Sequence, residues 1–316
     1  EVVWAPYFES SELRTSRGHN QGKDPQGLDR PVLDDTAAAS LRRAHAVVGM
    51  DLPDDIAALA PNLRLWQGIG AGYDHIDGDA LAAMGAVQCN ASGIASIPIA
   101  EFVIGRLLQV WKHLRELDAS QDRHEWAIRY GRQLAGCTVG IVGLGAIGRQ
   151  VALRARAFDM TVLATRGSAK RGDVDPDVDE LFPAADADEM LARSDAVVLA
   201  LPATPESEGF IDARRLALLP EGAVLVNVAR GMHVVEPDLI AALESGHLGA
   251  AVLDVTRNEP LPPDDPLWDA PNLYLSPHSS VSLDRYEATV VDLAAANIDA
   301  FIHGRPLQNV VNDPRQ

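Results

Sequence analysis

The chain has 316 residues, 47% of them apolar and 23% charged, and a formal net charge of −18 at pH 7. That length suits two domains better than one. The acidic excess argues against nucleic acid and anionic membranes as partners, because both require a basic surface on the protein.

No apolar run approaches the roughly 18 residues that a membrane span requires. The first eight residues also lack the basic and apolar regions of a signal peptide, so we expect a cytoplasmic protein. Cys89 and Cys137 have no C-x-x-C spacing and are expected to be reduced thiols in the core. The chain does not begin with methionine, so the first residues of the natural protein are expected to be missing.

The N-terminal part alternates short strands with polar connections. A strand is predicted at residues 2–4, and the Gly-, Ser- and Asp-rich stretch up to Arg30 predicts a loop. Asp35 or Thr36 is expected to cap a helix that runs through Ala44. The following strands are predicted at residues 46–48 and 63–66.

The second of these strands ends in Gly68-Ile69-Gly70-Ala71-Gly72. Three glycines within five residues predict a bare backbone turn that another group can approach closely. Taken alone, this turn is better explained as a merely tight connection.

The rest of the chain follows a strand–helix rhythm. Pro98 and Glu101 begin an amphipathic helix predicted over residues 99–117. From Thr138 onward, continuous apolar runs alternate with helical stretches, which is typical of a buried parallel sheet. The strands are predicted at residues 138–142, 161–164, 196–201, 223–228, 250–255 and 273–275, and the last helix at residues 284–302.

A glycine-rich turn follows the strand at residues 138–142. Gly143-Leu144-Gly145-Ala146-Ile147-Gly148 is a G-x-G-x-x-G, and a helix continues from it to Phe158. Gly143 permits the tight turn, Gly145 lets the backbone approach a pyrophosphate, and Gly148 lets helix and strand pack closely. Ala146 and Ile147 open the helix, whose first N–H groups attract phosphate. This strand–turn–helix context predicts dinucleotide binding.

The end of the next strand bears on the choice of dinucleotide. An enzyme that uses NAD normally has Asp or Glu about 20 residues beyond the glycine motif, to bind the ribose 2′-hydroxyl. This chain has Thr165 instead, followed by Arg166, Ser168, Lys170 and Arg171, with no acid before Asp173. A cation without a carboxylate suits a 2′-phosphate, so NADP is the expected preference. The alternative is that these residues form a solvent-facing loop and that NAD serves equally well.

The acidic run at residues 173–180 superficially resembles a calcium loop. The run fails that pattern at three positions, because Pro176 lies inside it, Val178 occupies the glycine position and Ala184 stands in place of a bidentate Glu. We therefore expect a solvated acidic loop, and no metal site in the chain.

Three ionisable residues follow predicted strands in the second half of the chain: Arg230, Glu259 and His278. Open α/β sheets bind their ligands at the C-terminal ends of the strands. Arg230 is suited to bind a carboxylate and polarise a carbonyl, and His278 to transfer a proton near neutral pH. Glu259 would hold the other ring nitrogen. Each residue alone has an ordinary structural explanation, but together beside a dinucleotide turn they predict the reduction of a 2-keto acid.

These residues resemble the D-isomer-specific 2-hydroxyacid dehydrogenase family. The resemblance extends from about residue 46 to residue 311, and it is carried by residues 70–74, 142–148, 201–205, 227–231, 254–261 and 276–278. It implies that backbone N–H groups at Gly70, Ala71 and Gly72 bind the substrate carboxylate, together with Arg230 and His278. It implies that Asp254 accepts a hydrogen bond from the nicotinamide carboxamide. The cofactor groove would be lined by Leu201, Pro202, Thr204, Val228, Ala229 and Ser280, alongside Arg230 and His278.

Two stretches depart from the family's pattern. Residues 256–258 replace a stretch that is usually aromatic and acidic, and residues 279–281 lack the small glycine often found after His278. Both changes put the identity of the substrate in doubt.

The expected architecture is α/β, with two Rossmann-like or flavodoxin-like domains built on doubly wound parallel sheets. Residues 98–283 would bind the dinucleotide, and residues 1–97 with 284–316 would form a discontinuous substrate domain. The expected activity is reduction of glyoxylate, hydroxypyruvate or a longer 2-oxoacid to the D-2-hydroxy acid, with His278 as acid/base and NADP preferred over NAD. The helix at residues 99–117 resembles the family's dimer contact, which implies a homodimer. Two alternatives stay open: phosphoglycerate dehydrogenase, and a dinucleotide-sensing, corepressor-like binding protein.

Overall fold

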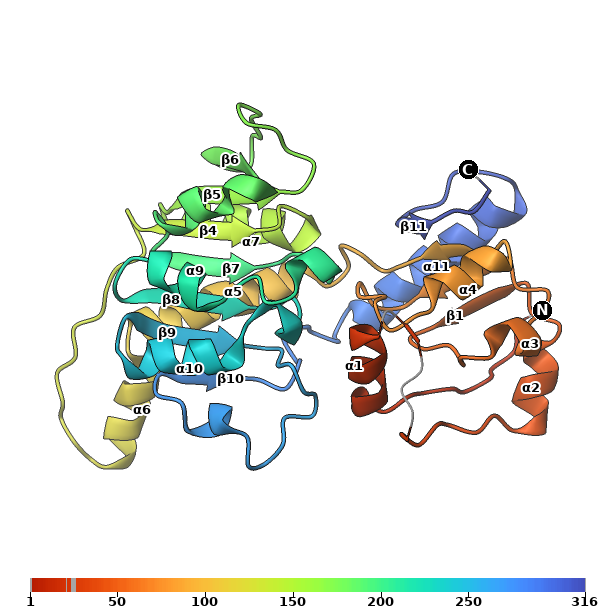
Figure 1. Ribbon diagram of the computed structural model, residues 1–316, viewed down its shortest axis with the longest axis horizontal. Helices are drawn as coiled ribbons and strands as arrows, with labels where there is room; N and C mark the ends of the chain where they lie inside the picture. The colour runs from red at the N-terminus through yellow and green to blue at the C-terminus, as the bar shows by residue number, and fades with distance from the viewer. Residues whose placement is uncertain (1, 21, 24–26, 316) are drawn as a thin grey trace. The chain divides into compact units, whose positions relative to one another are not determined.

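The computed structural model describes residues 2–20, 22–23 and 27–315 and divides the chain into two compact units. The first unit combines the residues up to Ala95 with those from Leu283 onward, and the second runs from Ser96 to Ser282. Each unit is a sheet of mainly parallel strands with helices packed on it, which confirms the predicted α/β class (Figure 1). None of the described helices is long and apolar enough to cross a bilayer.

The first unit has a four-stranded sheet in the order β1-β2-β3-β11, with β11 antiparallel to β3 and the other neighbours parallel. The strands are β1 (Ala46–Gly49), β2 (Leu65–Gly68), β3 (Val87–Cys89) and β11 (Val310–Asn312). The helices are α1 (Ser11–His19), α2 (Asp35–Leu41), α3 (Ile56–Leu59), α4 (Gly78–Ala83) and α11 (Tyr286–Ile302). All four residues of β2 are buried, as expected of a central strand covered on both faces.

The start of the chain differs from the prediction. Residues 2–4 form no strand, and the stretch predicted as a loop contains α1. Only Leu13 and Arg17 of this helix are buried, so it lacks the apolar stripe that indicates a helix in a sequence. A buried ion pair fixes it instead, because Arg17 Nη1 lies 3.0 Å from Glu9 Oε1 and the Glu9 amide donates to Asp51 at 2.9 Å. Burial raises the pKa of Glu9, and the Arg17 guanidinium opposes that rise.

Buried amides join the C-terminal helix α11 to β2. Asn297 has no exposed surface, and its Nδ2 donates to Gln67 Oε1 at 2.6 Å and to the Gln308 carbonyl at 3.0 Å. Its Oδ1 accepts from the Gln308 amide at 2.8 Å. Gln67 donates in turn to the carbonyls of Gly68 and Asn90. The two separate parts of the chain in this unit are therefore held together by buried polar groups that satisfy one another.

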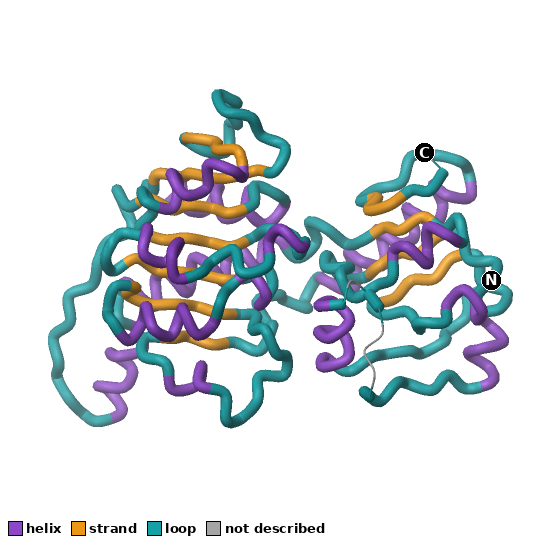
Figure 2. Tube along the Cα trace, in the orientation of Figure 1, coloured by secondary structure: helices purple, strands orange, loops and turns teal. Residues whose placement is uncertain are grey.

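The second unit has a seven-stranded parallel sheet in the order β10-β9-β8-β7-β4-β5-β6 (Figures 1 and 2). The strands are β4 (Thr138–Val142), β5 (Thr161–Arg166), β6 (Glu180–Pro183), β7 (Ala196–Leu199), β8 (Ala223–Asn227), β9 (Leu248–Leu253) and β10 (Leu273–Leu275). The chain begins in the middle at β4, moves outward to β6, and then returns to β7. The winding therefore reverses between β4 and β7, the position where open α/β sheets bind their ligands.

Helices cover both faces of this second sheet. α9 and α10 lie on one face and α5 on the other, where it packs against α7 (Figure 1). The helices are α5 (Ser96–Trp111), α6 (Leu114–Asp122), α7 (Ala146–Ala157), α8 (Ala187–Leu191), α9 (Ala213–Leu218) and α10 (Glu236–Glu244). Short 3-10 turns are η1 (Ala184–Asp186), η2 (Pro205–Ser207), η3 (Gly231–His233) and η4 (Pro266–Asp269). Buried Val, Leu and Ile side chains of the strands and of the covering helices form the core.

Strand positions agree well with the prediction. β4 and β10 have the predicted bounds, and apart from residues 2–4 the ends of the other predicted strands deviate by no more than two residues. β3, β6 and β11 have no counterpart in the prediction. α2 is capped by Asp34, one residue before the expected cap. Cys89 and Cys137 are buried free thiols, as predicted.

The single helix predicted at residues 99–117 is two helices. α5 ends at Trp111, and α6 begins after His113, whose φ of 54° is left-handed. The cause is tertiary, because the Trp111 carbonyl accepts from the Arg132 amide at 2.8 Å instead of continuing the helix. Gly131 packs so closely there that a Cβ on it would lie 2.4 Å from the same carbonyl oxygen.

We expect Asn297→Ala to lower the free energy of unfolding by about 2–4 kcal/mol, because it leaves the buried Gln67 oxygen and the Gln308 backbone groups without partners. Urea unfolding followed by circular dichroism measures the change. Asp292→Ala, on the exposed side of the same helix, is the matched control and should cost less than about 0.5 kcal/mol. Equal stability of the two variants would show that the amides do not hold α11 to β2.

Candidate active site

The glycine-rich turn joins β4 to α7 at the reversal point of the second sheet. Gly143 has a φ of 103°, and a Cβ on it would come within 2.6 Å of the Ala200 carbonyl oxygen in the loop after β7. A Cβ on Gly148 would lie 2.2 Å from the Gly143 oxygen, so α7 and β4 pack against each other there. Gly145 has open space around its Cβ position, and both it and Ala146 are exposed. The turn therefore presents the first N–H groups of α7 to solvent, as a pyrophosphate site requires.

The end of β5 lies against this turn. The Thr165 carbonyl accepts from the amides of Gly143 and Leu144 at 3.2 and 2.9 Å. Arg166 is the last residue of the strand, and Ser168 beyond it is exposed. The expected cation is therefore present beside the expected phosphate turn.

Arg166 is not without a carboxylate, however. Asp175 Oδ2 lies 3.0 Å from Arg166 Nη1, so a carboxylate from further along the chain accompanies this arginine. Sequence spacing missed Asp175 because the loop before β6 folds back onto β5. The acidic run is mostly exposed as predicted, but the Asp175 side chain is only 6% exposed.

His278 and Glu259 form a direct hydrogen-bonded pair. His278 Nδ1 lies 2.8 Å from Glu259 Oε2, with 50% of the histidine side chain and 20% of the glutamate side chain exposed. The other carboxylate oxygen of Glu259 accepts from the Thr256 amide at 3.2 Å. Both oxygens of Glu259 are therefore engaged, which fixes the orientation of the imidazole and leaves Nε2 as the nitrogen that can meet a ligand.

The segment around His278 is held by the buried Asp254, which is 1% exposed. Its carboxylate accepts from Ser276 Oγ at 2.7 Å, from the Ser279 amide at 3.0 Å and from the Ser280 amide at 3.1 Å. The His278 amide donates to the Asp254 carbonyl at 2.8 Å, and His278 itself is left-handed, with a φ of 51°. Asp254, to which the family resemblance gives a cofactor contact, serves in this structure to hold the residues on both sides of His278.

Arg230 lies three residues beyond β8, on a segment packed against the one that precedes Glu259. A Cβ on Gly231 would fall within 2.0 Å of the Thr256 carbonyl atoms, so only glycine permits this approach. The buried Asn227 fixes the turn by donating to the Arg230 carbonyl at 2.8 Å and accepting from the Ala229 amide at 3.0 Å. Sequence reasoning did not single out Asn227 or Gly231, although both flank Arg230 in the stretch that carried the resemblance.

Glu236, at the start of α10, also supports this region. Its Oε1 accepts from the Arg257 amide at 2.7 Å, two residues before Glu259. Burial raises the pKa of Glu236, and the hydrogen bond from the Arg257 backbone opposes that rise. No motif pointed to this residue, because its contact joins segments about 20 residues apart.

The remaining predicted residues lie in three places. Leu201, Pro202 and Thr204 follow β7, in the loop whose Ala200 carbonyl meets the glycine turn. Val228 and Ala229 are buried after β8. Gly70, Ala71 and Gly72 belong to the first unit, after β2. In the part of the chain that the structure describes, no group of three or more His, Cys, Asp or Glu is placed to hold a metal ion.

The chain matches the family model described as D-isomer specific 2-hydroxyacid dehydrogenase, NAD binding domain, over residues 104–280. D-3-phosphoglycerate dehydrogenase of Methanocaldococcus jannaschii is 33% identical over 84% of this chain and 51% of its own length. Glyoxylate reductase of Thermofilum pendens is 32% identical over 82% of this chain and 77% of its own length. The chain thus spans about half the length of the first relative and most of the second.

Solved structures give the same match. The crystal structure of a D-isomer specific 2-hydroxyacid dehydrogenase from Xanthobacter autotrophicus, in complex with NADPH and MES, aligns with a TM-score of 0.75. It is 29% identical, and the alignment covers 97% of each chain.

We expect Asp254→Asn to release the His278 segment, because an amide offers one acceptor oxygen and turns an NH₂ group toward a backbone donor. Loss of an acceptor for these buried donors should lower the free energy of unfolding by about 2–3 kcal/mol. It should also weaken the His278–Glu259 hydrogen bond, which ¹⁵N-histidine NMR detects as faster solvent exchange of the Nδ1 proton. Asp264→Asn, at an exposed position in the loop before η4, is the control and should change neither property. An unchanged Nδ1 proton in Asp254→Asn would contradict the positioning role.

Proposed function

We propose that this chain, because it belongs to the D-isomer-specific 2-hydroxyacid dehydrogenase family, reduces a 2-keto acid to the D-2-hydroxy acid with a nicotinamide dinucleotide. The observation that carries the proposal is the 2.8 Å hydrogen bond between His278 Nδ1 and Glu259 Oε2. It lies at the C-terminal edge of the same sheet that carries the glycine turn.

The proposed chemistry divides among three side chains. Arg230 pairs with the substrate carboxylate and polarises the neighbouring carbonyl. Glu259 accepts from Nδ1 of His278, which fixes the orientation of the ring, so that Nε2 is the nitrogen that donates the proton to the carbonyl oxygen. The glycine turn would hold the pyrophosphate of the dinucleotide, whose reduced nicotinamide would supply the hydride to the carbonyl carbon. Because His278 is half exposed, Nε2 is accessible to a small substrate.

The two units take separate roles in this proposal. The unit from Ser96 to Ser282 binds the dinucleotide, and the other unit contributes backbone donors to the substrate carboxylate. The Gly70 carbonyl accepts from the Ala91 amide at 2.9 Å, and the Ala71 carbonyl accepts from Asn90 Nδ2 at 2.7 Å. In a trans peptide the N–H points opposite to the C=O, so the amides of Ala71 and Gly72 point away from residues 90–91. Donors so oriented suit an anion.

NADP is the proposed preference within this chemistry. Thr165 in place of an acid, followed by Arg166, supports it, and the Xanthobacter relative was crystallised with NADPH. The matching family model is named for NAD binding, and Arg166 is paired with Asp175 at 3.0 Å. We therefore propose that NADP is preferred but that NAD is also accepted.

The proposed substrates are glyoxylate, hydroxypyruvate or a longer 2-oxoacid. The glyoxylate reductase relative supports the first of these. The phosphoglycerate dehydrogenase relative favours a second candidate, 3-phosphohydroxypyruvate. A dinucleotide-sensing binding protein on the same fold would instead bind nucleotide with little turnover.

Initial rates of NADPH and NADH oxidation across these acids test the activity, and His278→Ala tests its mechanism. We expect turnover of at least one 2-keto acid by the parent chain. In His278→Ala we expect kcat to fall by about 100- to 10,000-fold, because the proton donor is gone. Nucleotide affinity should survive, since the glycine turn is intact.

His303→Ala, at an exposed histidine just beyond the last helix, is the control and should retain full kcat. Nucleotide binding without turnover on the whole panel would favour the sensing protein. Equal kcat in His278→Ala and the parent would remove the imidazole from the mechanism.

We further propose a cytoplasmic homodimer. The buried free thiols Cys89 and Cys137 fit a reducing compartment. The segment after α6 carries Trp126, Ile128 and Tyr130 with 98%, 70% and 88% of their surfaces exposed, and it is drawn as an extended loop in Figure 2. Three large, exposed apolar side chains within one short segment suit contact with a second copy of the chain.

Trp126→Glu combined with Ile128→Glu should convert the dimer to a monomer, because charges would be buried without partners in the contact. Light scattering coupled to size-exclusion chromatography measures the mass. Val32→Glu alters an equally exposed apolar residue in the other unit and should leave the dimer intact. A monomeric parent chain, or a double variant that stays dimeric, would contradict the proposal.

A further inference from the structure

Two arginines beside the glycine turn share one carboxylate. Arg149 follows Gly148 directly in α7, Arg166 ends β5, and Asp175 comes from the loop between β5 and β6. Arg149 Nη1 and Nη2 lie 2.9 and 2.8 Å from the two oxygens of Asp175. Arg166 Nη1 lies 3.0 Å from Asp175 Oδ2. Asp175 is therefore bound by one guanidinium through two hydrogen bonds and by the other through one.

A carboxylate bridging two guanidinium groups takes the place that a phosphate group would take, because both anions fit the planar fork of arginine. The Asp175 side chain is 6% exposed, so the contact is shielded from water. The hydrogen bonds from Arg149 lower the pKa of Asp175 to about 2, and the Asp177 backbone and the Arg166 charge act in the same direction. Asp175 is thus negatively charged at every pH at which a dinucleotide would be bound.

The position of Arg166 fits the adenosine end of a dinucleotide. The strand that follows the glycine motif ends beside the ribose 2′-position in such folds, and Thr165 here contacts the motif directly. Nε of Arg166 is buried and has no hydrogen-bond partner among the described residues. This guanidinium therefore has donor capacity that Asp175 does not use.

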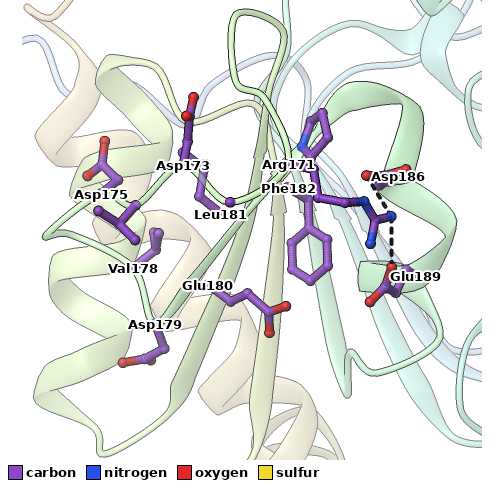
Figure 3. A pocket seen from close by; sticks show the side chains of 13 residues that line it. Arg171, Asp173, Asp175, Val178, Asp179, Glu180, Leu181, Phe182, Asp186 and Glu189 are labelled. Atoms are coloured by element: carbon purple, nitrogen blue, oxygen red, sulfur yellow. Dashed lines mark hydrogen bonds and ion pairs between the residues drawn. The ribbon is translucent and has the colours of Figure 1, made fainter.

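The surface on which Asp175 lies does not offer another phosphate site. Asp175 lines a cavity of about 280 Å³ together with Asp173, Asp179, Glu180, Asp186 and Glu189 (Figure 3). Arg171 is the one cation among the described lining residues, and it is paired with Asp186 at 2.9 Å and Glu189 at 3.4 Å. An acidic lining repels phosphate, so a 2′-phosphate depends on the guanidinium groups that Asp175 contacts.

We propose that Asp175 is a specificity-determining residue, whose carboxylate competes with the 2′-phosphate of NADP for the Arg166 guanidinium. This proposal rests on the proposed function, because it assumes that the dinucleotide binds at the glycine turn. Arg149 keeps Asp175 through its two hydrogen bonds, while Arg166 exchanges its single bond to Asp175 for the phosphate. The chain thereby accepts NADP at reduced affinity and leaves the binding of NAD unaffected.

The test uses 2′,5′-ADP and 5′-AMP, which differ by the 2′-phosphate alone, with affinities measured by isothermal titration calorimetry on the full chain. Asp175→Asn should bind 2′,5′-ADP about 10-fold more tightly than the parent does. In this variant Arg166 no longer gives up a charge-assisted hydrogen bond to Asp175 when it binds the 2′-phosphate. Its affinity for 5′-AMP should stay within about twofold. Asp177→Asn is the matched control, because of the two arginines Asp177 contacts only Arg149. This variant should change neither affinity.

Arg166→Gln provides a second variant in case Asp175→Asn folds poorly. It should remove the parent's preference for 2′,5′-ADP over 5′-AMP, since the phosphate loses its cation while Asp175 stays on Arg149. An unchanged ratio of the two affinities in either variant, with 5′-AMP still bound, would overturn the role of Asp175 and leave the proposed function standing. A parent chain that binds neither nucleotide would overturn both.

Discussion

The candidate site depends on the hydrogen bonds that the buried carboxylate of Asp254 accepts. Three donors of the segment at residues 276–280 converge on it, and the His278 amide binds its backbone carbonyl. A left-handed residue other than glycine costs roughly 1–2 kcal/mol, which these hydrogen bonds offset at His278. Without them the imidazole would have no fixed direction from which to meet Glu259. The position of Asp254 follows from the sheet, because β9 lies between β8 and β10 in fixed parallel register.

The same sheet brings the other parts of the site together. Strands β8, β9 and β10 are neighbours, so the segments beyond them lie side by side and carry Arg230, Glu259 and His278 at one edge. Gly231 makes this proximity possible, since any side chain there would collide with the backbone at Thr256. The glycine turn lies at the same edge, where the winding reverses. The residues that we propose bind the dinucleotide, donate the proton and bind the substrate carboxylate are thus held by one rigid scaffold.

Charge is used locally in this acidic chain. Asp175 joins two arginines next to the phosphate turn, and Glu9 pairs with Arg17 inside the first unit. In each case the anion comes from a segment that the sequence predicted as a polar loop. The net charge of −18 says nothing about these pairs. The burial of each pair, rather than the sum of charges, determines how strongly its members interact.

The sequence by itself determined six of the seven strands of the second sheet, the glycine turn and the order of Arg230, Glu259 and His278, because apolar runs and short motifs are local properties of a chain. It missed α1 and the break after Trp111, which depend on a buried ion pair and on a carbonyl taken by Arg132. It also missed Asp175 and Glu236, whose partners lie elsewhere in the fold, and Asn227, whose side chain binds the turn that follows it. Only the tertiary structure decided which polar groups meet, because a hydrogen bond needs two atoms within about 3 Å, whatever their separation along the chain.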